Sequence, residues 1–348
     1  MSSSMASSSH KFQAPSPNCK GLFVGSGSDG MNDPLVAQTI LNLAHDHDES
    51  TTAKTTTAIA ATTPKNILYL GTATYDLPGP KKRQTQRFLE AGCVVRSLDV
   101  IASNPDDMED MVESADVIIV SGGNTLYAVD RWKQLGLDEL LRKAMHRGVV
   151  LTGGSAGAIC WFDGGHSDSM DPTSFRSFMQ GNAEGGNQEQ QDESSLPPSS
   201  LKDVKRWEYI RVDGLGFLPG LICPHYDKVQ SNGVLRATDF DNMLLRHPEE
   251  VGIGIDHWAA LEVRGDKFRV LRLKGKEGSV LPDKSFSSDQ KGVPGVWIKE
   301  VRDDGKIHSR LCPDSGLLND ILRPTTEIVE DPRVKVCRKL NPPNKYDL

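Results

Sequence analysis

A single serine among small residues is the first feature of this sequence that could do chemistry. Residues 149–162 read VVLTGGSAGAICWF, so an apolar strand runs into two glycines, Ser155 and another small-residue stretch. A sharp strand-to-helix turn can expose a serine hydroxyl at a sheet edge, and the N–H of the next residue can face a developing oxyanion. The same letters also suit a tight turn whose serine only caps a helix. Both interpretations have to be weighed against the rest of the chain.

A second pair of glycines follows another apolar strand. The stretch VSGGNTL places Gly122 and Gly123 at a strand end, where they could offer a second N–H to the oxyanion, and Asn124 is expected to cap the following helix. An ordinary loop with an asparagine cap accounts for this stretch when it is taken alone. Two such loops after neighbouring strands favour the hydrolase interpretation.

A serine nucleophile needs a base, and His225 is the best candidate among the nine histidines. It ends the apolar stretch LICPHYD, where pocket residues emerge from a sheet. His166, in a glycine loop soon after the serine, is the rival. The third member should be a carboxylate that holds the imidazole tautomer, and the stretch FDGGHSDSMDP offers Asp163, Asp168 and Asp171. Each of the three could instead cap a turn.

Composition excludes several other classes of protein. The net charge is −7, which argues against a chain whose main partner is nucleic acid, and no apolar run approaches the roughly 20 residues of a membrane-spanning helix. The six cysteines are scattered without a C-x-x-C pair, which indicates reduced thiols in the cytoplasm and no zinc site. His45 and His47 are interpreted as a solvated helix end, so we expect neither a metal nor another cofactor.

Apolar strands alternate with amphipathic helices over much of the chain. Strands are expected within 66–73, 93–101, 116–123 and 149–154, with helices between them. Nearly continuous Val, Ile and Leu strands are typical of a parallel sheet covered on both faces, which predicts a doubly wound α/β fold. The glycines at 25, 27 and 30 resemble a dinucleotide motif, but no acidic residue ends a second strand about 20 residues later. We interpret them as a strand-to-helix turn.

The predicted organisation is one α/β domain over 21–280 with low-complexity insertions near 46–64 and 180–200. Residues 251–265 and 267–273 are expected as an antiparallel strand pair. Residues 281–348 are expected as an extended tail with little regular structure, apart from one strand candidate at 295–301. Residues 1–20 are serine-rich and contain only two cations, which favours a disordered tail over an organelle transit sequence.

Three stretches in order, SGGNT, GGSAGAICWF with GGHSDS, and LGFLPGLICPHYD, resemble peptidase E, the aspartyl dipeptidase group of serine peptidases whose relatives include cyanophycinases. The resemblance covers roughly residues 21–273. It implies a class I glutamine-amidotransferase-like α/β sandwich. It also matches Ser155 to the nucleophile, His225 to the general base, and Gly123 and Ala156 to the oxyanion donors. Asp168 is our choice for the acid.

The resemblance implies hydrolysis of Asp-X dipeptides, and a cation should then hold the substrate side-chain carboxylate. Arg236 and Asn124 are the candidate substrate contacts, with Thr125 and Tyr127 as further candidates to line the pocket. A cyanophycinase-like or isoaspartyl peptidase, or a catalytically silent protein that binds acidic peptides, is the alternative. A small peptide is the expected partner, and a homodimer is the candidate assembly.

Overall fold

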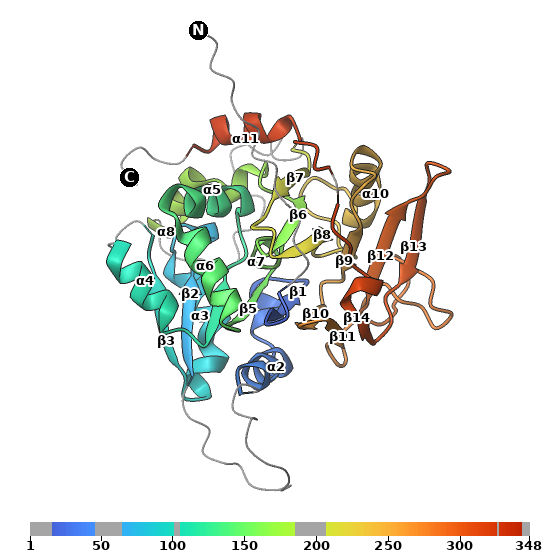
Figure 1. The fold of residues 1–348 in the computed structure, drawn as a ribbon. Helices are drawn as coiled ribbons and strands as arrows, with labels where there is room; N and C mark the ends of the chain where they lie inside the picture. Colours follow the sequence, from blue (N-terminus) through green and yellow to red (C-terminus); the bar gives the residue numbers. More distant parts are fainter. Residues whose placement is uncertain (1–15, 46–64, 101–104, 185–206, 326, 343–348) are drawn as a thin grey trace, which may run out of the picture.

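Two β-sheets form the framework of the protein in the computed structural model, which describes residues 16–45, 65–100, 105–184, 207–325 and 327–342 (Figure 1). The larger sheet has the strand order β14-β11-β10-β1-β5-β4-β2-β3, and the smaller has the order β13-β12-β9-β8-β6-β7. The strands of the larger sheet are β1 (Lys20–Val24), β2 (Asn66–Leu70), β3 (Val94–Leu98), β4 (Val117–Val120), β5 (Val150–Gly154), β10 (Ala259–Arg264), β11 (Lys267–Arg272) and β14 (Ser315–Leu317). Those of the smaller sheet are β6 (Phe162–Ser167), β7 (Ile210–Asp213), β8 (Leu218–Cys223), β9 (Gly252–Ile255), β12 (Val296–Val301) and β13 (Ile307–Leu311).

Helices cover both faces of the larger sheet (Figure 1). The helices of the described residues are α1 (Ser28–Met31), α2 (Pro34–His45), α3 (Pro78–Glu90), α4 (Pro105–Glu113), α5 (Thr125–Leu135), α6 (Leu137–His146), α7 (Ala156–Ile159), α8 (Arg176–Glu184), α10 (Arg236–Arg246) and α11 (Arg333–Leu340). Of these, α10 and α11 pack against strands of the smaller sheet. Short 3₁₀ turns lie at η1 (Thr72–Thr74), η2 (Pro172–Ser174) and η4 (Leu318–Asp320).

Alternate side chains of the central strands enter two different cores. On one face, residues such as Leu22 and Ile67 pack with α2 and α3. On the other face, Phe23 and Leu68 join a core that also contains Phe162 of the smaller sheet, and the rings of Phe23 and Phe162 lie 5.1 Å apart. Burial on both faces explains why these strands are almost continuously apolar. The five neighbouring strands β1, β5, β4, β2 and β3 are parallel, which confirms the predicted doubly wound α/β fold.

The stretch 251–265 differs from the single strand expected there. It divides into β9, in the smaller sheet, and β10, in the larger sheet, while the predicted antiparallel pair is formed by β10 and β11. The chain turns at Asp256, whose buried carboxylate accepts hydrogen bonds from the N–H groups of Ser279 and Gly295. These partners are distant in sequence, so a local pattern does not reveal the turn.

The chain also changes sheets directly after the serine loop. The helix that starts at Ala156 has only four residues, and β6 then begins at Phe162. Close backbone approach requires the glycines of β6, since a Cβ on Gly164 would lie 2.6 Å from the Val212 carbonyl oxygen. The segment expected as a glycine loop is therefore a strand.

The C-terminal segment differs from the extended tail expected for 281–348. It contains β12, β13, β14 and α11, and β12 pairs antiparallel with β9 and delivers buried Val296 and Ile298 to the core. The regular structure of this segment comes from pairing with a strand that is distant in the sequence. The expected insertion at 46–64 lies outside the described residues, as do most of the insertion near 180–200 and residues 1–15 of the N-terminal tail.

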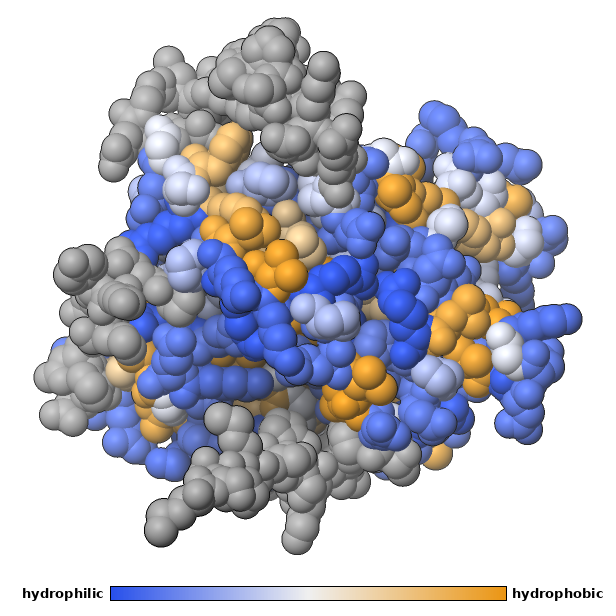
Figure 2. All heavy atoms as spheres, turned by 90° about the horizontal axis from the view of Figure 1, so that it is seen from above, coloured by the Kyte–Doolittle hydropathy of each residue, from blue (hydrophilic) through white to orange (hydrophobic). Residues whose placement is uncertain are grey.

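Among the described residues, no helix has both the length and the apolar composition needed to cross a membrane. Seen from above, hydrophilic residues cover much of the described surface and the apolar side chains form separate groups (Figure 2).

Candidate active site

Ser155 occupies the turn between β5 and α7, where the sequence predicts a nucleophile. Its φ of 56° and ψ of −121° lie in a region that residues with a Cβ rarely adopt. Such a conformation costs about 1–3 kcal/mol and persists only where the surroundings impose it. The surroundings here are tight, because a Cβ on Gly154 would lie 1.9 Å from the Ser26 carbonyl oxygen and one on Gly157 would lie 2.2 Å from that of Val120.

Glycines also form the walls around the serine. A Cβ on Gly27 or Gly122 would lie 3.8 or 3.6 Å from the Cβ of Ser155. Gly27 lies in the turn between β1 and α1, as predicted for this glycine motif. The glycine motif therefore forms a strand-to-helix turn that lies beside Ser155.

The second glycine loop lies between β4 and α5. Gly123 has a φ of 120°, and a Cβ there would lie 2.3 Å from the Ala73 carbonyl oxygen, so the position requires glycine. Asn124 caps α5, since its Oδ1 accepts from the N–H of Tyr127 at 3.0 Å. Its Nδ2 donates to the Ser169 carbonyl and to Ser174 Oγ, and the side chain is buried. Both ends of the Asn124 amide are thus engaged within the protein.

His225 follows β8 and is tied to the same strand end as Ser155. The N–H of Ser155 donates to the Val24 carbonyl at 3.1 Å, and the N–H of His225 donates to the carbonyl of the next residue, Gly25, at 2.9 Å. The end of β1 therefore anchors the backbones of both the candidate nucleophile and the candidate base. His225 also has a left-handed φ of 51°, and burial lowers the pKa of its ring well below the usual value, with the Arg236 charge acting in the same direction.

The ring of His225 contacts a second histidine. Its Nδ1 lies 2.9 Å from Nδ1 of His257, and Nε2 of His257 lies 3.1 Å from Oδ2 of Asp29. The backbone N–H of His257 donates to Oδ1 of Asp227 at 2.7 Å. His225, His257 and Asp29 thus form a connected row of polar groups, which the sequence analysis missed.

The strand order explains why Ser155, Asp29 and His257 lie at the same edge of the larger sheet. β1 lies between β5, which is parallel to it, and β10, which is antiparallel, so Val24 pairs with both Gly154 and Ala260. The ends of β1 and β5 and the beginning of β10 therefore share one sheet edge. Ser155 follows β5, Asp29 follows β1 and His257 precedes β10. The sequence signal that could have revealed His257 is its position beside an apolar strand in GIGIDHWAALEV.

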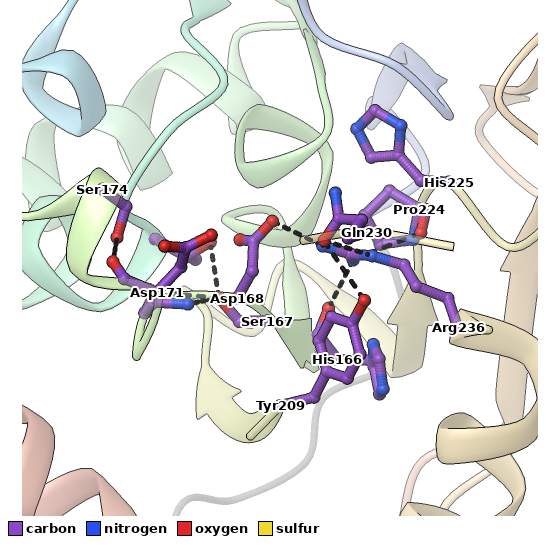
Figure 3. Close-up of polar contacts among 12 residues, drawn as sticks. His166, Ser167, Asp168, Asp171, Ser174, Tyr209, Pro224, His225, Gln230 and Arg236 are labelled. Atoms are coloured by element: carbon purple, nitrogen blue, oxygen red, sulfur yellow. Dashed lines mark hydrogen bonds and ion pairs between the residues drawn. The ribbon is translucent and has the colours of Figure 1, made fainter. Parts of the chain in front are cut away.

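Asp168, predicted as the triad acid, contacts Arg236. Its Oδ2 accepts from the Arg236 Nη2 at 2.6 Å, while the Nη1 of Arg236 donates to the carbonyls of His166 and Pro224. Figure 3 shows the Asp168 carboxylate directed toward Arg236, and the His225 ring pointing away from that guanidinium. Arg236 is fully buried. The guanidinium therefore links Asp168 to the residue before the candidate base.

The two other carboxylates accept hydrogen bonds from backbone N–H groups. Asp163 Oδ2 accepts from the N–H of Gly220 at 3.1 Å, and burial raises the pKa of Asp163 to about 6. Asp171 caps η2 by accepting from the N–H of Thr173 at 2.9 Å.

His166, the rival base, is buried in the smaller sheet. Its Nε2 lies 2.9 Å from Oδ1 of Asp239, and its ring packs 4.2 Å from that of Tyr209. Burial lowers the pKa of His166 to about 4, although the contact with Asp239 acts in the opposite direction. These partners give His166 a packing role.

Within the described part of the chain, no cluster of three or more His, Cys, Asp or Glu side chains is arranged to hold a metal ion. His47 lies outside that part.

Comparison with known proteins places this arrangement in a family. Residues 41–180 and 194–271 match peptidase family S51. The chain is 35% identical over 161 residues to the uncharacterized peptidase YgaJ of Bacillus subtilis (strain 168), and this match covers 46% of this chain and 54% of that protein. It is 29% identical over 339 residues to a Trypanosoma brucei brucei protein named G2/mitotic-specific cyclin-1, and this match covers 93% of each chain.

A solved structure shares the fold. The crystal structure of a peptidase from an acI-B1 Actinobacterium matches with a TM-score of 0.52 and 18% identity, and the match covers 87% of this chain and 98% of that one. This likeness agrees with the expected class I glutamine-amidotransferase-like fold. Since the family match spans more than half of the sequence and includes both Ser155 and His225, the chain belongs to peptidase family S51.

Proposed function

We propose that the protein is a serine-type dipeptidase that hydrolyses dipeptides with an N-terminal aspartate. The observation that carries the proposal is the anchoring of Ser155 and His225 to consecutive carbonyls at the end of β1. A serine hydroxyl becomes a nucleophile for acyl transfer when an imidazole can take its proton, and this anchoring supports such a pairing of Ser155 with His225.

In the proposed reaction, Ser155 Oγ attacks the peptide carbonyl carbon while Nε2 of His225 takes the hydroxyl proton. The N–H groups of Gly123 and Ala156 would face the oxyanion, and the first N–H groups of a helix have no partner within it. The C–N bond then breaks as His225 protonates the leaving amine. Water, deprotonated by His225, hydrolyses the aspartyl ester and restores Ser155.

The preference for aspartate rests on the resemblance of the three motifs to peptidase E. Arg236 was the predicted partner of the substrate carboxylate, but the structure pairs its guanidinium with Asp168. Arg236 also donates to Gln230 Oε1 and to the Pro224 carbonyl. These contacts favour a positioning role for Arg236, which would hold the loop that carries His225.

The deciding experiment is release of leucine from Asp-Leu by the purified protein, with chelator present, beside Ala-Leu, N-acetyl-Asp-Leu and β-Asp-Leu. We expect cleavage of Asp-Leu alone, and its loss in Ser155→Ala. Turnover of β-Asp-Leu would indicate an isoaspartyl or cyanophycinase-like peptidase instead. Folded protein that cleaves none of these substrates would contradict the proposal and favour a binding protein for acidic peptides.

We also propose a cytoplasmic location. All six cysteines are described, free and buried, which suits a compartment that keeps thiols reduced. Fractionation of cells that express the full chain tests this.

A further inference from the structure

The pair of facing nitrogens on His225 and His257 fixes where the protons lie. Two imidazole nitrogens 2.9 Å apart form a hydrogen bond only if one carries hydrogen and the other a lone pair. The second nitrogen of His257 faces Asp29 at 3.1 Å, and an ionised carboxylate only accepts hydrogen bonds. Nε2 of a neutral His257 must therefore carry its hydrogen, which leaves Nδ1 with the lone pair.

This assignment determines the tautomer of His225. Because Nδ1 of His257 accepts, Nδ1 of His225 donates, and Nε2 of His225 is left with a lone pair. A general base that takes a proton from serine needs its lone pair on that free nitrogen. We propose that His257, oriented by Asp29, is the positioning residue that fixes the tautomer of His225, in the place that a triad carboxylate would otherwise take. The proposal rests on the function assigned to His225 above.

The surrounding structure holds His257 rigidly enough for this role. Its N–H is anchored by Asp227 at 2.7 Å, and its side chain is only 14% exposed. The ring packs edge-on against that of Trp258, with centroids 4.6 Å apart. The preceding residue, Asp256, is buried and held by Ser279. An imidazole fixed by its own backbone and neighbours can orient another imidazole.

Burial lowers the pKa of both rings, and charged groups from three parts of the chain also act on the pair. Asp29 of α1 and Asp227 of the loop after β8 favour a positive charge on His257, whereas Arg236 of α10 and Lys228 disfavour one on His225. When His225 takes the serine proton, its imidazolium would donate to the neutral His257, and Asp29 would stabilise the charge from behind. Asp29 is 63% exposed, so solvent screens its contribution.

The proposal predicts a graded set of variants. His257→Ala removes the acceptor, and kcat should fall about 10- to 100-fold with little change in KM. His257→Asn places an amide oxygen near the former Nδ1 and should restore part of the loss. Asp29→Asn removes a negative charge that favours protonation, so the acidic limb of the rate profile should move to lower pH. His308→Ala is the matched control, because His308 pairs with Asp304 on the exposed edge strand β13.

Two readouts make the test independent of the dipeptide substrate. One is the rate at which a fluorophosphonate labels Ser155 as a function of pH, with Ser155→Ala as the blank. The other is the ¹⁵N spectrum of histidine-labelled protein, in which His225 should carry hydrogen on Nδ1 and lose that signature in His257→Ala. Labelling without dipeptide cleavage would reject the proposed substrate and still test the role of His257.

One result would overturn the proposal. In that case His257→Ala and Asp29→Asn would leave the labelling rate, its pH profile and the His225 tautomer unchanged, while folded Asp168→Asn would lose labelling. That outcome would assign the orienting role to Asp168, as the sequence predicts.

Discussion

At the scale of single residues, the site depends on two side chains held in unfavourable backbone conformations. Ser155 and His225 both have positive φ values, which glycine adopts without steric cost. The surrounding backbone imposes both conformations, since the N–H groups of the two residues are anchored to carbonyls at the end of β1. These two conformations therefore lower the free energy of unfolding at the positions where the proposed chemistry takes place.

Replacing Ser155 with glycine should expose this strain. Ser155→Gly removes the Cβ that disfavours a φ of 56°, while it adds entropy to the unfolded chain. We expect its free energy of unfolding to exceed that of Ser155→Ala by about 1 kcal/mol. Urea denaturation of both variants measures the difference. An equal or lower value for Ser155→Gly would show that the turn is unstrained, and neither variant should be labelled by a fluorophosphonate.

The pH dependence of Ser155 reactivity should report the pKa of the His225 imidazole. His225 acts as a base only when neutral, and burial moves its pKa below the ordinary value of about 6.5. The labelling rate should therefore stay high as pH falls to 6.5 and decline only below it. Labelling measured from pH 4 to 8 tests this, and a midpoint above 6.5 would contradict the assigned base or its burial.

At the scale of elements, short turns after parallel strands bring the site together. β5 ends in two glycines that allow its last residues to approach the turn after β1. The sequence revealed these turns because a glycine pair directly after an apolar run strongly favours a turn. It did not reveal the break between β9 and β10, since the residues that hold Asp256 lie more than 20 positions away in the sequence.

A single methyl group in the β5 turn should be costly. Gly154→Ala would place a Cβ 1.9 Å from the Ser26 carbonyl oxygen, and only movement of the backbone could relieve this overlap. We expect a loss of more than about 2 kcal/mol in the free energy of unfolding.

The matched control is Gly181→Ala in α8, where a Cβ would meet nothing within 4 Å. Alanine favours the helix there, so a gain of about 0.5–1 kcal/mol is expected. Thermal and urea unfolding measure the stability of both variants. An equal change in the free energy of unfolding for Gly154→Ala and Gly181→Ala would contradict the tight-turn argument.

At the scale of the whole molecule, the C-terminal segment is part of the fold. The carboxylate of Asp331 accepts from the Arg211 backbone N–H in β7 and from the Arg333 side chain. Further along, Arg338 pairs with Asp130 of α5 at 2.7 Å, and Cys337 is buried in the main core. The segment thus joins the smaller sheet to the helices that cover the larger one.

Asp331→Asn should destabilise the protein in a pH-dependent way. Burial raises the pKa of Asp331, but hydrogen bonds from Arg333 outweigh it, so the net shift is downward. A lowered pKa means that ionised Asp331 stabilises the folded state above the unfolded value of about 3.9, and that this is lost as pH falls through the folded pKa.

The variant should lose about 1.5–3 kcal/mol of unfolding free energy at pH 7, because a charge-assisted hydrogen bond is removed. The difference from the parent protein should shrink below about pH 4. Urea denaturation across this pH range measures it, and the exposed Asp304→Asn is the control with little expected change. A constant difference at all pH values would mean that the charge of Asp331 contributes nothing.

The sequence by itself determined the parallel α/β framework and the places where Ser155 and His225 leave their strands. These features follow from hydrophobic periodicity and from turn residues adjacent in the chain. Only the tertiary structure decided which groups surround the base, since Asp29 and His257 come from distant segments that meet when β1 pairs with both β5 and β10. It likewise directed Asp168 to Arg236, because side-chain partners depend on which strands become neighbours, and no local pattern encodes that choice.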